Sequence, residues 1–379
     1  MRFFGIDVHR KYCEGAELLP NNTIRHFRFP NERKAREKFA RGLDDQCKVA
    51  LEATGNALMI YDILSAHGAK VVLVNPMKTR AIAEARIKTD KIDAEILVRL
   101  LAADFVCECW VAPKEERDLR TLLHHRVALK KQVVSIKNRV HAILMRHSIP
   151  VPVSDLFGVK GRRFLFSLEG LPEVEKIVMA SNLKALEGLE AEVKAIEKEL
   201  YLRAKALPGV ELLLGIPGID VLAALTILAE VGDIRRFASA KKLASFAGVV
   251  PSVHQSGKVR YTGHITKGGR SMLRWIMIQV ALQVVRHPGS LRDFYLRLRG
   301  RKGHKIAIVA TARKLLTIIW VMLTRNVSYE YSRDDLKEKK IKRMEKRAMP
   351  YTVGSDMPQK ITSYLATEDD ILKIPESAA

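Results

Sequence analysis

FFGIDV, residues 3–8, is a short apolar run that carries a single carboxylate, Asp7. Its aromatic and β-branched residues predict a buried strand. Because side chains alternate along a strand, Asp7 lies on the face opposite Ile6. An isolated carboxylate in such a strand carries a large desolvation cost, so Asp7 marks a candidate functional site.

A second strand of the same kind is KVALEAT, in which Glu52 occupies a comparable place. Strands come first, and helices appear among the later ones, which is typical of a mixed sheet. We therefore expect an α/β domain over residues 1–112. Its predicted elements are a hairpin over residues 11–29 with a turn at 20–22, strands at 48–54 and 70–76, and helices at 57–67 and from about 89.

Asp90 and Asp93 stand at the start of the last of these helices, three residues apart, so that both carboxylates lie on one helix face. Like charges placed in this way repel unless a cation neutralises them, and oxygen ligands select Mg²⁺ or Mn²⁺. Each carboxylate has a simpler explanation alone, because Thr89–Asp90 suits a helix cap and Asp93 complements the helix dipole. The set of four with Asp7 and Glu52 is more specific. It predicts a metal centre whose two ions would activate the attacking oxygen and stabilise the leaving oxygen of a phosphoryl transfer.

The charge of the chain is strongly positive: 65 Lys and Arg stand against 42 Asp and Glu in 379 residues, a net charge of +23. Such an excess favours polyanions, of which nucleic acid is the commonest and an anionic membrane surface the alternative. Because no run of about 18 uninterrupted apolar residues occurs, a membrane-spanning helix is not expected. The four cysteines lack the spacing of a disulfide framework, and the N-terminus lacks the features of a secretory signal, so we expect a cytoplasmic protein.

The middle of the chain, residues 113–206, contains two long helical patterns. Residues 114–147 predict a basic amphipathic helix, and residues 173–205 predict a second helix of coiled-coil character, with the run LEGLEAEVKAIEKEL. We expect the two helices to pair as an antiparallel arm or to form the seam of a dimer.

A second globular unit, mostly helical, is expected over residues 207–328, followed by a basic and then acidic tail over 329–379. The unit begins with GIPGID, which resembles the turn of a helix-hairpin-helix motif, whose backbone N–H groups grip a phosphate. Here Asp220 stands where a second glycine is usual, and its charge opposes a phosphate. We therefore expect Asp220 to cap a helix over 221–231 and this element to serve packing rather than DNA binding.

The same unit contains a segment rich in glycine, serine and basic residues, 246–274, in which Ser256-Gly257 lies in a predicted turn. A serine in a cationic loop binds a phosphate, attacks it or simply occupies a turn, and its hydroxyl is a weak nucleophile unless a base or a metal activates it. Ser252 is a second candidate nucleophile, although the Ser-Gly pattern favours Ser256. We predict nucleic-acid contacts for the basic residues near both constellations: Arg86, Lys88, Lys258, Arg260, Lys267, Arg270 and Arg274.

The order strand-Asp, strand-Glu, helix-Asp-x-x-Asp resembles the ribonuclease-H-like fold of the Holliday-junction resolvase type. Over roughly residues 2–325 the chain also resembles the insertion-sequence-110 family of transposases. The motifs that carry this second resemblance are GIDV, LEATG, VNP and KTDKIDA in the first part, and GIPGID, FASAKKLASFAG, P-x-x-x-x-S-G and ITKGG-x-x-x-LR in the last.

What the family resemblance implies is a prokaryotic DEDD-type recombinase with a two-part active site. Asp7, Glu52, Asp90 and Asp93 would hold Mg²⁺ or Mn²⁺, and Ser256 would be the nucleophile that forms a phosphoserine link to DNA. The two parts would come from different protomers of a tetramer assembled from dimers. The enzyme would act on donor and target DNA under the guidance of a structured bridge RNA.

Two other functions fit the residues. A structure-selective DNA endonuclease would use the same metal centre to activate water, while Ser256 would only bind phosphate. A non-catalytic RNA-binding or DNA-architectural protein would use its basic helices and hold a structural ion. The placement of Asp7 and Glu52 inside strands counts against the last function, because a scaffold has little reason to tolerate them.

Overall fold

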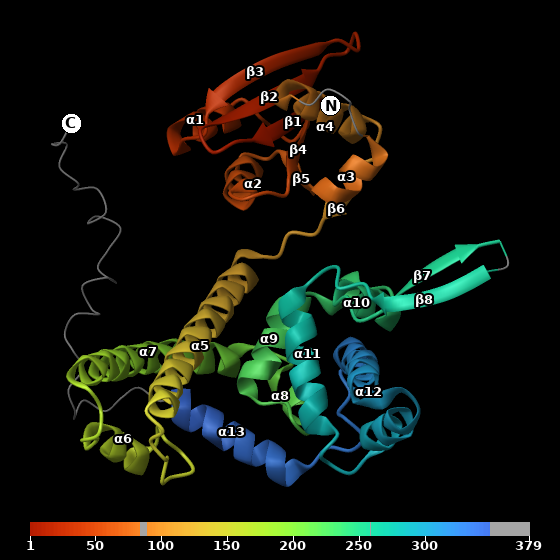
Figure 1. The fold of residues 1–379 in the computed structure, drawn as a ribbon. Coiled ribbons are helices and arrows are strands. Elements are labelled where there is room, and N and C mark those ends of the chain that lie inside the picture. The colour runs from red at the N-terminus through yellow and green to blue at the C-terminus, as the bar shows by residue number, and fades with distance from the viewer. Residues whose placement is uncertain (84–88, 258, 349–379) are drawn as a thin grey trace. The chain divides into compact units, whose positions relative to one another are not determined.

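A six-stranded sheet in the order β3-β2-β1-β4-β5-β6 forms the centre of the first part of the chain (Figure 1). Its first three strands form an antiparallel meander, the fourth and fifth lie parallel to the first, and the sixth is antiparallel to the fifth. The predicted hairpin and the predicted mixed sheet are both confirmed. The strands are β1 (Arg2–Val8), β2 (Tyr12–Leu18), β3 (Ile24–Pro30), β4 (Cys47–Glu52), β5 (Lys70–Val74) and β6 (Glu108–Cys109).

The computed structural model describes residues 1–83, 89–257 and 259–348. It separates into two units, Met1–Pro113 and Lys114–Ala379, here called unit 1 and unit 2. The finer division into four parts remains a prediction.

Alternation of side chains divides the core of unit 1 between the two faces of the sheet. On one face, Ile6 and Leu51 belong to an apolar cluster shared with α1 (Arg33–Ala40) and α2 (Ala57–Ala66). The opposite face is covered by α4 (Asp90–Ala102), which packs on β1, β2 and β4. The remaining helix of the unit is α3 (Pro76–Ile82).

Gly5 allows α4 to lie directly on β1. A Cβ atom at Gly5 would lie 2.3 Å from the Ala94 carbonyl oxygen and 2.6 Å from the Val98 nitrogen, distances that no real side chain tolerates. The start of the helix is set by Thr89, whose Oγ1 accepts a hydrogen bond from Ile92 N at 3.3 Å, so the predicted cap is confirmed. This close approach brings the first turn of α4 to the face of the sheet that carries Asp7.

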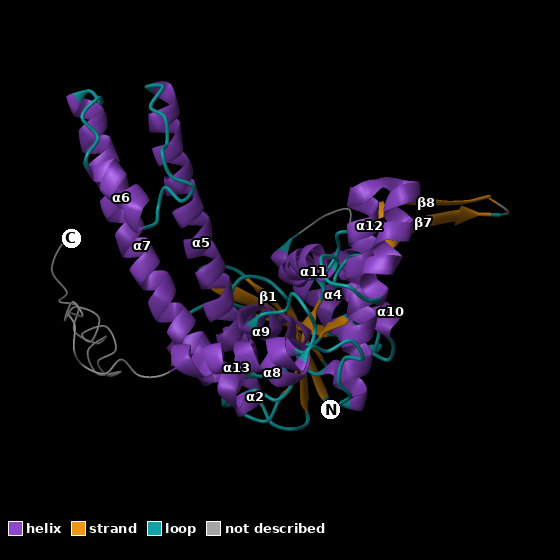
Figure 2. Cartoon of the chain, turned by 90° about the horizontal axis from the view of Figure 1, so that it is seen from below, coloured by secondary structure: helices purple, strands orange, loops and turns teal. Residues whose placement is uncertain are grey.

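Unit 2 begins with an antiparallel pair of long helices, α5 (Lys114–Arg146) and α7 (Glu173–Ala206), connected through α6 (Val159–Phe166). Ile143, near the end of α5, shares a cluster with Met179, near the start of α7. Leu123, near the start of α5, shares the main core with Leu200, near the end of α7. Figure 2 shows both helices extending away from those that follow. The antiparallel pairing is confirmed, and a role for the pair in dimerisation remains a prediction.

Helix α9 (Val221–Val231) is almost entirely buried and packs against α5, α7, α8 (Val210–Leu214) and α11 (Ser271–Val284). Asp220 caps α9 as predicted, since its Oδ1 accepts a hydrogen bond from Ala223 N at 2.8 Å. The Lys340 side chain contacts the turn before α9, where its Nζ donates to the carbonyl oxygens of Leu214 at 2.7 Å and Ile216 at 3.1 Å. The elements are α8 (Val210–Leu214), α9 (Val221–Val231), η1 (Ile234–Arg236), α10 (Ala240–Phe246), β7 (Pro251–Ser256), β8 (Val259–Ile265), α11 (Ser271–Val284), α12 (Ser290–Arg325) and α13 (Asp334–Ala348).

Helix α12 is long and apolar enough to span a membrane by length and composition, and 44 % of its most apolar window is buried. Leu315, Leu316 and Ile319 of this helix belong to the core of unit 2. The exposed residues Arg313 and Lys314 interrupt the apolar run. We therefore assign α12 to the core of unit 2.

Replacing Gly5 by alanine tests whether the close approach of α4 supports unit 1. The new methyl group must push α4 off the sheet, and overpacking of this kind costs about 2 kcal/mol of unfolding free energy. Calorimetry of the full chain, together with hydrogen exchange of the β1 and α4 peptides, measures the loss. Gly55→Ala is the control, because a Cβ there meets nothing within 4 Å, and its effect should stay within about 0.5 kcal/mol. Equal effects of the two substitutions would show that the approach is not tight.

Candidate active site

Asp7 and Glu52 lie level with each other at the carboxyl ends of two neighbouring parallel strands. β1 and β4 pair with Ile6 opposite Leu51, and the two acidic residues are the next in each strand. Gly5 and Ala50 are also paired and lie two residues earlier, so both acidic residues are on the face covered by α4. The Asp7 residue is 9 % exposed, which is unusual for a carboxylate.

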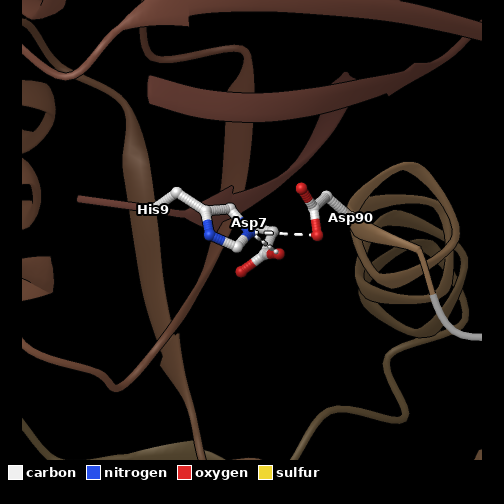
Figure 3. Close-up of side chains that lie close together, drawn as sticks. All are labelled: Asp7, His9 and Asp90. Atoms are coloured by element: carbon white, nitrogen blue, oxygen red, sulfur yellow. Dashed lines mark hydrogen bonds and ion pairs between the residues drawn. The ribbon is translucent and has the colours of Figure 1, made fainter. Parts of the chain in front are cut away.

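The first turn of α4 brings Asp90 to this edge of the sheet, where His9 lies between two carboxylates (Figure 3). His9 Nε2 is 3.1 Å from Asp7 Oδ2 and 3.1 Å from Asp90 Oδ1. Ligand atoms of these three side chains all lie within 4.8 Å of one another. A single cation can therefore contact Asp7, His9 and Asp90 together.

The two aspartates differ in their affinity for a proton. Burial raises the pKa of Asp7, and the charges of Asp93 and Asp90 raise it further against the opposing effect of His9. The pKa of Asp90 is lowered, chiefly because Tyr12 donates a hydrogen bond to it. Asp93 thus acts electrostatically on Asp7 from the same turn of α4, as its three-residue spacing from Asp90 predicts.

A network of hydrogen bonds on the first three strands lies beside the candidate site. The Tyr12 hydroxyl donates to Asp90 Oδ2 at 2.7 Å, and its ring stacks with that of His9 at 5.0 Å between centroids. Glu14 faces Asp7 across the β1–β2 pair and is 1 % exposed. Arg28 Nε donates to Glu14 Oε2 at 2.5 Å and neutralises it. Glu14 therefore lies beside the site without adding an unpaired charge to it.

The residues present fit a divalent cation. The carboxylates of Asp7 and Asp90 lie close enough to share one ion. Glu52 lies on the same sheet edge as Asp7, and Asp93 lies in the same helix turn as Asp90. Burial disfavours the charged form of Asp7 unless an opposite charge is supplied, and a bound cation supplies it. Oxygen-rich sets of this kind bind hard ions.

Ser256 ends β7 at the exposed end of a two-stranded hairpin with β8, which extends from the helices of unit 2 (Figure 1). The turn follows at Gly257, whose φ of 55° suits glycine. Ser252 lies at the other end of β7 and is half-buried, with its Oγ against Gly263, where a Cβ would lie 2.6 Å away. Ser256 is therefore the more accessible of the two candidate nucleophiles.

Backbone hydrogen bonds clamp the base of this hairpin to α10. Lys267 N donates to Gly248 O at 3.3 Å, and Arg270 N donates to Phe246 O at 2.9 Å. Gly269 has a φ of 82°, and a Cβ there would lie 2.1 Å from Phe246 O. The F-A-G and K-G-G motifs of the sequence are thus two halves of one backbone contact that holds the hairpin.

The predicted nucleic-acid residues have different surroundings. Arg270 Nε donates to Oε2 of the buried Glu230 at 2.7 Å, and Arg274 donates to the carbonyl oxygens of Ala247 and Lys267 at 3.1 and 3.0 Å. Both arginines thus have intramolecular partners, whereas the Lys267 residue is exposed. Their contacts with nucleic acid remain predictions. Of the others, Arg260 lies on β8, and Arg86, Lys88 and Lys258 lie outside the described residues.

Three residues at or beside this candidate site are not predicted from the sequence: His9, Tyr12 and Glu14. His9 follows Asp7 by two residues, which on a continuing strand means the same face, and this signal was present in the D-V-H triplet. Tyr12 and Glu14 depend on the register between β1 and β2, which only the structure reveals.

In a comparison with known proteins, two protein-family models match the chain. A model described as the transposase IS116/IS110/IS902 family matches residues 210–296, and a transposase model of the IS110 DEDD class matches residues 4–149.

Three relatives show the extent of the likeness. The transposase for insertion sequence element IS1111A of Coxiella burnetii is 29 % identical and aligns over 74 % of this chain and 79 % of its own length. The putative transposase y4rJ of Sinorhizobium fredii is 30 % identical over 74 % of this chain and 78 % of its own. The pilin gene-inverting protein of Moraxella lacunata is 27 % identical over 86 % of this chain and 97 % of its own.

Asp7→Asn should separate metal binding from stability. Without metal, the raised pKa of Asp7 means that its ionisation opposes folding, so stability falls as pH rises through the folded-state pKa. The asparagine variant should therefore melt at a higher temperature than the wild type at neutral pH, and the difference should vanish in acid, where Asp7 is neutral in both states.

Addition of Mn²⁺ or Mg²⁺ should reverse this order. An ion at 100 times its Kd stabilises the wild type by about 2.7 kcal/mol, and the variant should gain little. Thermal melts across a metal titration measure both effects. Asp104→Asn, which removes an exposed carboxylate paired with Lys48, is the control and should keep the full metal response. An unchanged metal response in Asp7→Asn would remove Asp7 from the metal site.

Proposed function

This chain belongs to the IS116/IS110/IS902 family of transposases, enzymes that act on DNA, and from that premise we propose that it cleaves and rejoins DNA strands through a metal-assisted serine. The observation that carries the proposal is the buried Asp7 at a sheet edge where Glu52, Asp90 and Asp93 also lie. This is the arrangement that a phosphoryl-transfer site requires, because the reaction concentrates negative charge on oxygen.

In the proposed mechanism, Asp7, Glu52, Asp90 and Asp93 would hold Mg²⁺ or Mn²⁺, which supplies Lewis-acid stabilisation of the attacking and leaving oxygens. His9 would serve as a further ligand or as a proton carrier beside the ion. Tyr12 orients Asp90 through its 2.7 Å hydrogen bond, so that this carboxylate presents its other oxygen to the site.

Ser256 would act as the nucleophile. Its Oγ would lose a proton to a base and form a bond to the phosphorus of the DNA backbone, while the bond from phosphorus to one bridging oxygen breaks and that oxygen leaves with the electron pair. The product is a phosphoserine link that conserves the energy of the phosphodiester, so the reverse attack by another DNA end rejoins a strand. Exposure of Ser256 at the end of its hairpin supports this role.

The assembly forms the second part of the proposal. The strand order β3-β2-β1-β4-β5-β6, with a meander followed by parallel strands, supports a ribonuclease-H-like fold of the resolvase type for unit 1. The α5–α7 pair would act as a coiled-coil dimerisation arm, and dimers would join in a tetramer in which one protomer's carboxylates serve another protomer's Ser256. A structured bridge RNA would select donor and target DNA in the prokaryotic cytoplasm.

A relative called a pilin gene-inverting protein supports recombination rather than simple cleavage, because inversion requires strands to be rejoined. A structure-selective endonuclease that uses activated water would share the metal centre. The two functions differ in whether the protein becomes attached to DNA.

Ser256→Ala should abolish the covalent adduct between protein and DNA. Loss of a nucleophile costs at least about a thousandfold in strand transfer, because water is a poor substitute in a site built for serine. The full chain is incubated with the element's flanking non-coding transcript, labelled target DNA and Mg²⁺, and adducts are counted on denaturing gels. Chelation of the metal should remove the adduct in the wild type as well.

Ser252→Ala is the matched control, four residues away in the same strand, and should keep the adduct. Metal-dependent melting should be the same in both variants and the wild type, since neither serine belongs to unit 1. An adduct that persists in Ser256→Ala, or hydrolysed ends without any trapped protein in the wild type, would replace the serine mechanism by the nuclease one.

A further inference from the structure

The long helix α12 is broken at Gly303, which has φ 78° and ψ 168°. Only glycine adopts this backbone conformation readily. A Cβ at Gly303 would meet nothing within 4 Å, so glycine is needed here for its backbone and not for space. The helix thus consists of two segments joined by a built-in bend.

Contacts across the bend hold the two segments in place. The hydroxyl of the buried Tyr295 is 2.8 Å from His304 Nδ1, and Lys314 Nζ lies 4.7 Å from the centre of the Phe294 ring. Both contacts join a residue before Gly303 to one after it. The bend is therefore a fixed turn anchored to the core of unit 2.

The residues around the bend form a dense and uncompensated positive surface, here called the basic turn, residues 297–305. All residues from Arg299 to Ile306 are exposed, whereas a helix lying on a core buries one side. The sequence contains no Asp or Glu between Asp293 and Glu330. The exposed cations of the basic turn are Arg297, Arg299, Arg301, Lys302 and Lys305.

Among the residues that the structure describes, none of these five cations forms an ion pair. Two arginines of the helical pair in the same unit do form ion pairs: Arg126 contacts Glu197 at 2.6 Å, and Arg162 contacts Glu190. Five like charges on nine residues repel one another, and a polyanion with regularly spaced charges relieves that repulsion. The charge pattern thus calls for an external partner of opposite sign.

The composition of the basic turn favours a duplex backbone over a looped single strand. Recognition of unpaired bases uses exposed aromatic rings as stacking platforms, and residues 297–305 contain no Phe, Tyr or Trp. Phosphate contacts need only cations at the surface. The family acts on DNA, which makes duplex DNA the polyanion that this surface meets.

The position of α12 relates the basic turn to the serine hairpin. α12 packs on α10, which leads into β7, and Trp320 Nε1 of α12 donates to Phe237 O at 3.0 Å. Figures 1 and 2 both show α12 beside the base of the β7–β8 hairpin. We propose that the basic turn of α12 binds the phosphate backbone of duplex DNA and aligns it toward the Ser256 hairpin. The alignment rests on the proposed role of Ser256, whereas the binding does not.

The salt dependence of DNA binding tests the proposal. The variant Arg301→Gln, Lys302→Gln, Lys305→Gln removes three exposed cations. The full chain is titrated with a labelled DNA duplex by fluorescence anisotropy at several salt concentrations. Each lost phosphate contact lowers the slope of log K against log salt by about 0.9, so a fall of about 2 to 3 is expected.

The control variant is Lys339→Gln, Lys342→Gln, Lys346→Gln, which removes the same charge from exposed positions of α13. Its slope should change by less than about one. Equal losses in the two variants would mean that net charge alone matters and would overturn the proposal. The proposal would also be overturned if the basic-turn variant lost affinity for a structured RNA while keeping its affinity for DNA.

Two glycine variants test the bend itself. Gly303→Ala strains the backbone and should weaken DNA binding roughly five- to tenfold. Gly300→Ala, three residues earlier in the helical segment and equally free of neighbours, should leave binding unchanged. Wild-type affinity in Gly303→Ala would show that the bend is not needed. Ser256→Ala should bind DNA normally in this assay, so a failure of the serine mechanism and a failure of the basic turn are separate results.

Discussion

The burial of the Asp7 carboxylate under the first turn of α4 is the constraint on which unit 1 depends. Gly5 allows the helix to touch the strand, and Thr89 fixes where the helix begins, so together they determine how closely the acidic groups of helix and sheet approach. The arrangement opposes folding when the site is empty of positive charge, because burial and neighbouring carboxylates both disfavour the ionised Asp7. Unit 1 thus carries a local instability at the edge of the sheet that holds Asp7, as functional sites often do.

The two units place their chemistry differently. In unit 1 the acidic groups lie on rigid elements and are surrounded by the ordered contacts of Tyr12, Glu14 and Arg28. In unit 2 the serine stands at the exposed end of a hairpin, and only the base of that hairpin is clamped by backbone contacts. The proposed metal centre would need fixed ligand distances, whereas the proposed nucleophile would need room for the DNA strand linked to it.

Most elements of the fold were predictable because their patterns are local. The strand of Asp7, the hairpin after it and the paired helices α5 and α7 follow from alternation or from helical spacing of apolar residues. The positions of Asp7, Glu52, Asp90 and Asp93 on strand ends and a helix start were predictable for the same reason, whereas their role stays a prediction. The contact of Lys340 with the turn before α9 was not predictable, since it joins distant parts of the chain through tertiary packing. The Tyr295–His304 contact was not predictable either, since it depends on the bend at Gly303. Glu14 was missed for the same reason, because its place beside Asp7 depends on strand register.

The contact of Lys340 with the turn before α9 has a consequence for the order in which the two units fold during synthesis. The sheet of unit 1 ends at Cys109, so all of its strands exist before unit 2 has been synthesised. The core of unit 2, in contrast, contains Met344 and Ala348 of α13, and the carbonyl oxygens of Leu214 and Ile216 receive their partner from the same helix. Contacts of such long sequence separation form late. Unit 1 can therefore fold while the chain is still on the ribosome, whereas unit 2 completes its core only after α13 has been synthesised.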